Sequence, residues 1–395
     1  SELFNQQTIE AMSARFTALL NSIIANPDTR LKQLNIQTVA EKEQKMKQQQ
    51  KRKASGFKSF KKIKPKAVNV NQTSLVKTDY LDTNNLLPLV IKPAVADVDL
   101  VSWLQQHRDY IETELVKHGG ILFRGFNVPT ASDFQAVAEA ICPKLFDEYN
   151  DLPREGVTNK VYGATPYPAD RPILFHSESS HMHRFPQKIW FFCLKAAESG
   201  GETPIVDCRK IYQRLDPKLR EKFAQKKLMY VRNYTQDLDV PWQEFFHTND
   251  KAEVEAFCQQ AGMQWEWKGE NTLRTSQITP AIIEHPKTGE KSFFNQIQLH
   301  HVSCLDAEVK ASLLSLFSAT DLPRNVFYGD GTPIEDEVVQ EIQQLYQEEQ
   351  CAFSWQEGDV LMLDNLSTAH GRNPYVGERK TVVAMGEMMS FGNRE

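Results

Sequence analysis

The sequence lacks the features of exported and membrane proteins. It contains no run of about 18 apolar residues, so no membrane-spanning helix is expected. Residues 1–5 show neither the basic start nor the apolar stretch of a signal peptide, and we therefore expect a cytoplasmic protein. The six cysteines include no CxxC pair. They predict buried thiols and not a disulfide framework or a zinc knuckle.

The sequence also lacks internal repeats, and its composition is not that of a chain that is disordered throughout. Of the 395 residues, 41% are hydrophobic and 25% are charged, which is an ordinary globular balance. This length allows two or three domains, or one large β-rich domain with extensions.

Charge is distributed unevenly along the chain. Residues 41–66 contain 11 Lys or Arg and two Glu, a local charge of +9, so the total of −5 leaves −14 for the rest. A basic run can contact nucleic acid, but this one has no nucleic-acid-binding motif, and the acidic remainder would repel phosphate. We interpret it as a solvated linker, with docking to an acidic protein partner as an alternative.

Three segments are expected along the chain. Residues 6–25 place apolar side chains at steps of three and four, which predicts an amphipathic helix that ends at Asn26-Pro27. We therefore divide the chain into a helical segment at 1–27, a basic linker at 28–73 and a main domain at 74–395.

The main domain is predicted to be α+β. Strands are expected at 87–91 and 121–124, and from residue 173 onward many short apolar runs are separated by turn signals. This pattern favours an antiparallel β barrel or jelly roll. Helices are expected around these strands, at 97–118, 131–141, 207–226, 250–261 and 306–319.

Three side chains suggest a metal site. His176 and Glu178 follow an apolar run, and alternate residues of a strand point to the same face. His370 follows a second strand at 360–363. Two histidines and one carboxylate leave three positions of an octahedral ion open, as in non-haem Fe(II) oxygenases. Each motif alone is weak, since an exposed strand pair or a hydrogen-bonded loop histidine explains it equally well.

Other histidines lie close to these in the sequence. His181 and His183 would overfill the metal, so we place them in the core or in a substrate loop. His300 and His301 are adjacent, and neighbouring strand residues face opposite ways, so at most one is expected to face the cavity.

The order of the motifs resembles that of the taurine dioxygenase-like family of Fe(II)/2-oxoglutarate-dependent oxygenases. It starts with His176-Ser177-Glu178 and Gly200-Gly201-Glu202-Thr203-Pro204, and the later motifs are Trp355-Gln356-Glu357-Gly358-Asp359, Asp364-Asn365, Ala369-His370-Gly371-Arg372 and Gly377-Glu378-Arg379. The resemblance covers residues from about 86 onward and is strongest to the branch with Glu in the HxD/E motif, which includes clavaminate synthase and nonribosomal peptide β-hydroxylases. It implies a double-stranded β-helix, or jelly roll, with flanking helices.

The resemblance also implies the site. His176, Glu178 and His370 would bind Fe(II), while Arg379 and Thr203 would bind the distal carboxylate of 2-oxoglutarate, with O2 as the second co-substrate. The nine-residue gap from His370 to Arg379 is shorter than usual for the family, so Arg372 is a rival anchor.

Substrate contacts and reaction type are implied less directly. Arg274 and Asn295 lie in stretches that resemble the family's cavity lining, although a surface charge and a turn residue are the alternatives. A carboxylate at position 178 implies oxygen insertion, because related halogenases have a small residue there. Hydroxylation is the leading interpretation, with desaturation, epoxidation or a catalytically inactive module as alternatives.

The first 27 residues resemble the end of a condensation domain of nonribosomal peptide synthetases. This resemblance implies a megasynthase context and an aminoacyl substrate tethered to a carrier protein. An acidic carrier would suit the basic run at 41–66, whereas no nucleic-acid or membrane partner is expected.

Overall fold

The computed structural model describes residues 75–82, 85–146, 156–158, 160–164, 167–235 and 239–391, and five residues near the N-terminus. By contacts the chain forms two units, Ser1–Asn71 and Gln72–Glu395. The predicted basic linker lies outside the described residues, as does most of the predicted N-terminal helix. The description below therefore concerns the second unit.

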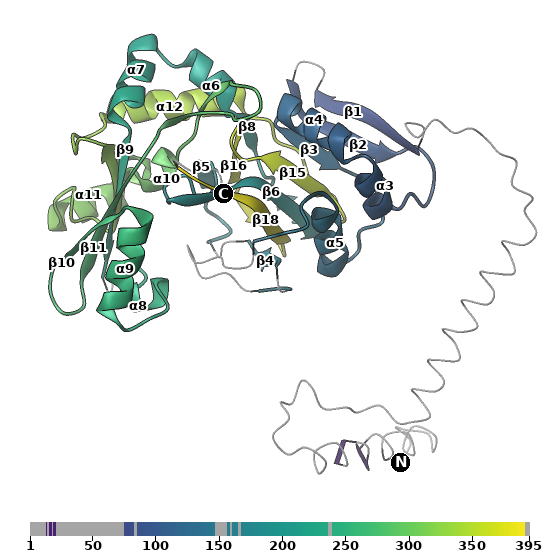
Figure 1. The fold of residues 1–395 in the computed structure, drawn as a ribbon, viewed down its shortest axis with the longest axis horizontal. Helices are drawn as coiled ribbons and strands as arrows, with labels where there is room; N and C mark the ends of the chain where they lie inside the picture. The colour runs from purple at the N-terminus through teal and green to yellow at the C-terminus, as the bar shows by residue number, and fades with distance from the viewer. Residues whose placement is uncertain are drawn as a thin grey trace, which may run out of the picture. The chain divides into compact units, whose positions relative to one another are not determined.

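A seven-stranded sheet runs through the middle of this unit (Figure 1). Its strands, in spatial order, are β1 (Val76–Asp82), β2 (Asn85–Pro93), β3 (Gly120–Phe123), β15 (Val360–Asp364), β6 (Arg184–Lys195), β18 (Lys380–Ser390) and β4 (Tyr162–Gly163). β2 and β3 are parallel, and the other neighbours are antiparallel.

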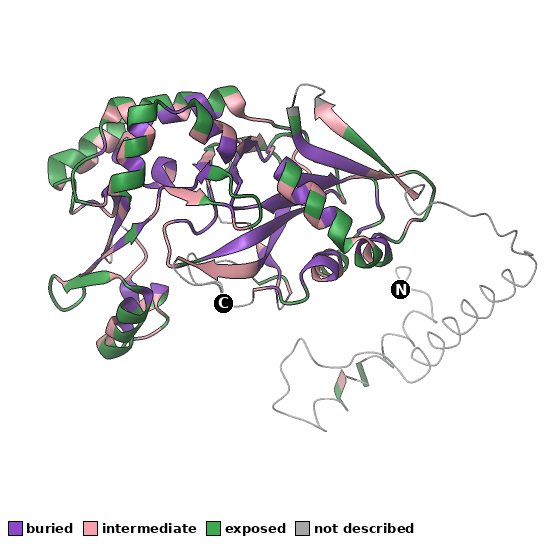
Figure 2. Cartoon of the chain, turned by 45° about the horizontal axis from the view of Figure 1, so that its top comes forward, coloured by how far each residue is buried: buried purple, intermediate pink, exposed green. Residues whose placement is uncertain are grey.

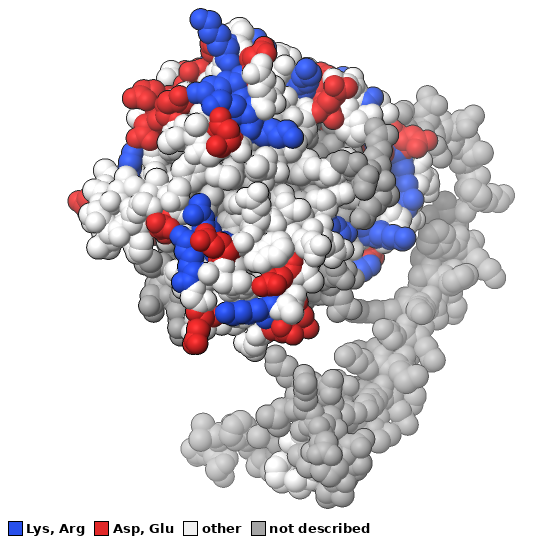
Figure 3. Space-filling model, turned by 60° about the vertical axis from the view of Figure 1, so that its left-hand side comes forward, with Lys and Arg blue, Asp and Glu red and all other residues white. Residues whose placement is uncertain are grey.

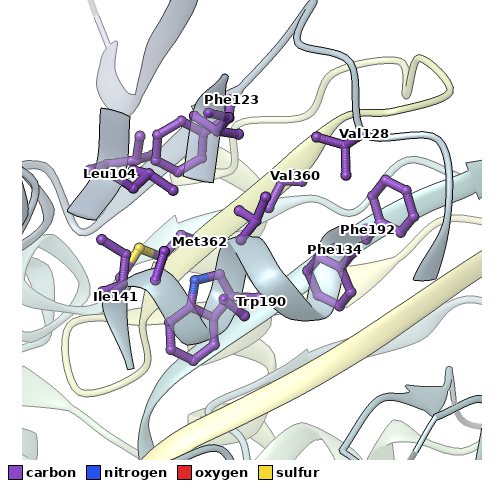
Figure 4. Packing of buried hydrophobic residues seen from close by; sticks show 14 of the residues in the cluster. Leu104, Phe123, Val128, Phe134, Ile141, Trp190, Phe192, Val360 and Met362 are labelled. Carbon is purple, nitrogen blue, oxygen red and sulfur yellow. The ribbon is translucent and has the colours of Figure 1, made fainter. Parts of the chain in front are cut away.

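Both faces of this sheet are covered, which explains its uninterrupted apolar runs. Every residue of β15 is buried. Helices α3 (Leu100–Gln106), α4 (Arg108–His118) and α5 (Ala131–Ile141) cover one face, where Trp190 and Met362 pack with Phe134 (Figure 4).

The opposite face packs on a second, smaller sheet. This sheet contains β5 (Ile173–His176), β16 (Thr368–Arg372) and β8 (Ile205–Asp207), with β16 in the middle and all pairs antiparallel. Ile205 of β8 lies in one apolar cluster with Phe191 and Leu361 of the main sheet. Two facing sheets of this kind are what the jelly-roll prediction requires.

The remaining elements surround this pair of sheets. A third sheet has the order β10 (Gln264–Trp267), β11 (Leu273–Thr279), β9 (Leu228–Tyr234), β14 (Arg324–Tyr328). Two short pairs are β12 (Ile282–Glu284) with β13 (Lys291–Phe293), and β7 (Ser199–Gly200) with β17 (Tyr375–Val376). The helices are α6 (Cys208–Arg214), α7 (Pro217–Lys226), α8 (Trp242–Phe245), α9 (Lys251–Ala261), α10 (Ile297–His300), α11 (Ala307–Leu316) and α12 (Asp336–Glu349), with a 3-10 turn at Val302–Cys304. Figure 2 shows buried central strands and helices exposed on their outer faces.

Two predicted helices are each split in the structure. The segment 97–118 forms α3 and α4, because the backbone leaves the helical conformation at His107. The segment 207–226 forms α6 and α7. The second helix begins at Pro217, and the Asp216 carboxylate before it accepts hydrogen bonds from the backbone N–H groups of Lys218 and Leu219.

Two further expectations concern the thiols and the membrane. All six cysteines are free, four of them buried and two, Cys304 and Cys351, half-buried. Among the described helices, none combines the length and apolar character needed to cross a bilayer.

Candidate active site

The small sheet and one turn bring His176, Glu178 and His370 together. His176 on β5 is the direct cross-strand partner of His370 on β16. The Glu178 Oε2 lies 3.9 Å from His176 Nε2 and 3.6 Å from His370 Nε2, and one ligand atom from each residue lies within 4.8 Å of the others. One ion placed between them can contact all three.

The surroundings prepare these groups to bind a metal. Nδ1 of His176 donates to the carbonyl of Leu174 at 2.9 Å, which leaves Nε2 as the lone-pair nitrogen facing the carboxylate. The His370 ring packs against Phe191, with ring centres 4.8 Å apart. Two imidazoles and one carboxylate match the donor set for non-haem Fe(II), so these residues fit that ion.

The local structure of Glu178 differs from the prediction. β5 ends at His176, and Glu178 lies in the turn that follows, where Ser179 has a φ of 54°. The carboxylate therefore reaches His176 from a turn and not from the same strand face. Asn365 fixes this turn: its Oδ1 accepts the N–H of Glu178 at 2.7 Å, and its Nδ2 donates to the Glu178 carbonyl at 3.0 Å.

A second cluster lies in the same cavity, around Arg379. Its Nε donates to the Gly201 carbonyl at 2.8 Å, and its Nη2 lies 3.4 Å from the Thr203 hydroxyl. Gly201 has a φ of 72°, and a Cβ at this position would lie 2.9 Å from Cδ of Arg379. Glycine therefore leaves the space that the Arg379 side chain occupies. Trp355 Nε1 donates to Thr203 at 3.1 Å, so the hydroxyl receives two donors and its own proton is available for an acceptor in the cavity.

The electrostatics of this end of the cavity favour an anion. Burial and, next, the charge of Arg372 lower the pKa of Arg379 from 12.5 to about 10. Each guanidinium disfavours the charged form of the other, and a carboxylate placed between or beside them would stabilise both charged forms.

Arg372, the rival anchor, has other partners. Its Nη1 donates to the Tyr167 carbonyl, and its Nη2 donates to the carbonyls of Pro168 and Arg171. This guanidinium holds the loop at residues 167–171, which forms part of the cavity wall. The arrangement supports Arg379 as the residue that binds a carboxylate.

One cavity of about 800 Å³ joins these groups. Its inner wall contains the three candidate iron ligands together with Thr203 and Arg379. The wall continues to α10 and to exposed residues at the beginning of α11, so the cavity opens to solvent. A volume of this size is typical of sites for ligands much larger than a small keto acid.

Neither expected substrate contact is brought to this cavity. Arg274 lies on β11 in the third sheet, where its charge helps to lower the pKa of Asp321, and it is not part of the cavity wall. Asn295 is a buried residue between β13 and α10: its Oδ1 accepts the N–H of Ile297, and its backbone carbonyl accepts the N–H of Ser177. The alternatives stated for both residues fit the structure better.

The other histidines lie near the site in different roles. His181 and His300 line the cavity with rings 4.9 Å apart, whereas His183 and His301 do not line it. One of the adjacent pair faces the cavity, as expected, but both belong to α10 and its C-terminal cap and not to a strand.

Three residues of the site were not assigned a role from the sequence. Asn365 and Trp355 were noted as parts of motifs, and both are buried in the structure. Gln298 lines the cavity from α10 and carried no sequence signal.

Comparison with known proteins agrees with this geometry. Residues 83–385 match the profile described as "Taurine catabolism dioxygenase TauD, TfdA family". The chain belongs to the TauD/TfdA dioxygenase family. It is an Fe(II)/2-oxoglutarate-dependent dioxygenase, and the predicted family and cofactors are confirmed.

Several known proteins are similar to this chain. The dapdiamide synthesis protein DdaC of Enterobacter agglomerans is 34% identical over 310 residues, covering 76% of this chain and 94% of that protein. The clavaminate synthase-like protein At3g21360 of Arabidopsis thaliana is 30% identical over 320 residues, covering 75% and 93%. Among solved structures, PvcB of Pseudomonas aeruginosa matches with a TM-score of 0.47 and 12% identity, covering 82% of this chain and 94% of that one.

Proposed function

We propose that this dioxygenase hydroxylates an unactivated C–H bond of an amino acid, free or tethered as an aminoacyl thioester to a carrier protein, in the biosynthesis of a peptide natural product. The balanced reaction consumes substrate, 2-oxoglutarate and O2 and yields the alcohol, succinate and CO2. The observation that carries the proposal is the His176–Glu178–His370 cluster, which shares one cavity with Arg379 and Thr203.

Each of these residues has a defined part in the proposal. His176, Glu178 and His370 would hold Fe(II), which with bound 2-oxoglutarate supplies the oxidising chemistry. Arg379 would bind the distal carboxylate of the co-substrate through charge-assisted hydrogen bonds, and the Thr203 hydroxyl would donate to the same carboxylate. Phe191 and Val383 add apolar surface to the cavity and help to exclude water.

The substrate class is supported by three observations. A relative that aligns over most of its length is named for dapdiamide synthesis. The first 27 residues resemble the end of a condensation domain. The cavity opens to solvent and is larger than 2-oxoglutarate requires, so a substrate on a flexible arm could enter it.

Alternatives from other classes have less support. A catalytically inactive module would have no need for the complete ligand set and the second, cationic cluster. Nucleic-acid binding is not favoured either: on the face in Figure 3, the groups of Lys and Arg lie beside Asp and Glu.

The test has two parts. The purified protein with added Fe(II) should release succinate from 2-oxoglutarate, and His176→Ala should abolish both iron binding and this release. Mass spectrometry on a panel of free and carrier-loaded amino acids should then detect a product with one added oxygen atom. A product with two fewer hydrogens would instead show desaturation, and no succinate release under any condition would support the inactive module.

A further inference from the structure

Helix α10 (Ile297–His300) forms the cavity wall beyond the candidate iron ligands. Gln298, Leu299 and His300 all line the cavity. The helix packs against β5, the strand that carries His176. Side chains on α10 are therefore placed relative to the iron site by direct packing.

Hydrogen bonds fix this placement further. The side chain of Gln296 donates to the carbonyl of Ser177 at 3.1 Å, and its backbone N–H donates to the Tyr230 hydroxyl at 2.9 Å. The N–H of Ser177 donates back to the Asn295 carbonyl at 3.1 Å. Because Ser177 lies between two candidate iron ligands, these hydrogen bonds join the start of α10 directly to the metal site.

Gln298, unlike Gln296, has a buried side-chain amide nitrogen without a hydrogen-bond partner among the described residues. Only 4% of Gln298 is exposed, yet its Nε2 has no hydrogen-bond partner among the described residues. Leaving a buried amide donor unpaired costs about 1–3 kcal/mol, and such groups are rare in folded proteins. A bound molecule that offers an acceptor oxygen would remove this cost.

Several other polar groups of the cavity are already committed, whereas the buried Thr381 hydroxyl, like the Gln298 amide nitrogen, has no partner among the described residues. Arg379 and Thr203 suit the carboxylate of 2-oxoglutarate, and Arg372 is bonded to three backbone carbonyls. The carboxylate of Asp239, further along the wall, accepts from Arg232 and Arg324.

We infer that Gln298 recognises the substrate by donating a hydrogen bond to a carbonyl or carboxylate oxygen of its acyl chain. This inference rests on the proposed function and specifies the substrate class: an acyl group with an acceptor oxygen that reaches α10 while its target carbon lies at the iron. Because an amide is uncharged, this contact would distinguish substrates by whether they offer a hydrogen-bond acceptor and not by their net charge. Sites of this kind reject analogues that lack the bonding group, because the buried partner is then left unpaired.

The experiment compares Gln298→Met, a near-isosteric change that removes the donor, with the matched control Gln277→Met. Gln277 is also a buried glutamine, 8% exposed, whose Oε1 has no partner among the described residues, but it lies on β11 outside the cavity wall. The probes are N-acetylcysteamine thioesters of the amino acids. Binding is followed by the change in the absorption band of the anaerobic Fe(II)–2-oxoglutarate complex.

We expect at least one probe to bind the wild type, and Gln298→Met to weaken its binding by about tenfold or more, the equivalent of one lost hydrogen bond. Gln277→Met should bind the probe like the wild type and keep its probe-free succinate release and KM for 2-oxoglutarate. In Gln298→Met the loss of probe affinity should exceed any change in probe-free succinate release. Unchanged probe affinity in Gln298→Met, or no band change with any probe, would overturn the inference. Succinate release without probe is measured separately, so failure of the proposed function is distinguished from failure of the Gln298 contact.

Discussion

At the scale of single residues, the two arginines of the cavity show how contacts distinguish like side chains. Arg372 donates to three neutral carbonyls and organises a loop, whereas Arg379 donates to one carbonyl and one hydroxyl. Sequence spacing could not separate them, because both follow His370 closely and both are suited to a carboxylate.

Replacing Arg379 with Lys tests this assignment through pH. Burial lowers the pKa of Arg379 to about 10, so the wild type keeps its charge up to about pH 9, and its KM for 2-oxoglutarate should be flat from about pH 7 to 9. A lysine starts from a pKa of about 10.4, and the same burial should lower it, so the variant should lose its charge, and its affinity, as pH rises through this range. The KM for 2-oxoglutarate of the wild type and of the variant is measured at several pH values from the rate of succinate release. Arg372→Ala is the control, and a raised KM for 2-oxoglutarate in that variant, together with an unchanged, pH-independent KM in Arg379→Lys, would reassign the anchor.

Asn365 offers a second residue-scale prediction. Its amide holds the backbone of Glu178 from both sides and also donates to the Pro186 carbonyl. Asn365→Asp would put an acceptor against two carbonyls, so we expect Fe(II) affinity to fall by about tenfold or more, measured by chelator competition. Asn325→Asp is the control, since Asn325 is equally buried but bonds Ala319 and Val326 away from the ligands. Equal losses of iron affinity in both variants would mean that Asn365 acts only through general stability.

At the scale of elements, the pairing of β5 with β16 decides whether a metal site forms. The register opposes His176 and His370 directly, and Gly371 follows His370 where the strands come close. A Cβ on Gly371 would lie 2.7 Å from the carbonyl oxygen of Ile173.

Gly371→Ala should therefore separate the two strands and move one histidine from the other. We expect weaker Fe(II) binding with much of the fold retained, measured by metal titration beside circular dichroism. Gly156→Ala is the control, because a Cβ there would meet ordinary contacts only. Wild-type iron affinity in Gly371→Ala would show that the strands accommodate the added methyl without moving the ligands.

The elements also show what the sequence could and could not predict. The ligand types His176, Glu178 and His370 were predictable from the order of their motifs, which resembles that of the family, although only the structure shows that His370 lies on β16 and is paired directly with His176 on β5. The turn at Glu178 was not, because it depends on Asn365, 187 residues away in the chain. The cavity lining was not predictable for a similar reason: only tertiary structure shows that Arg274 lies in a separate sheet and that Gln298 of α10 lines the cavity.

At the scale of the whole molecule, the proposed carrier-tethered substrate raises the question of how the catalytic unit would meet a carrier protein. The family match begins at residue 83, and the contact-defined unit that contains the cavity begins at Gln72, so the basic run at 41–66 precedes both. Its charge of +9 is opposite in sign to that of an acidic carrier protein, and attraction between such patches raises association rates and is screened by salt.

Deleting residues 41–66 should therefore leave iron binding and probe-free succinate release unchanged, because the cavity and its ligands lie entirely in the second unit. With a carrier-loaded aminoacyl substrate, kcat/KM should fall and lose most of its salt dependence, since the attraction that speeds encounter has been removed. A variant of the same length with Lys and Arg in this run replaced by Gln separates charge from linker length. If both variants oxidise the carrier-bound substrate like the wild type at low salt, the run is a spacer, and the carrier must be recognised by the catalytic unit itself.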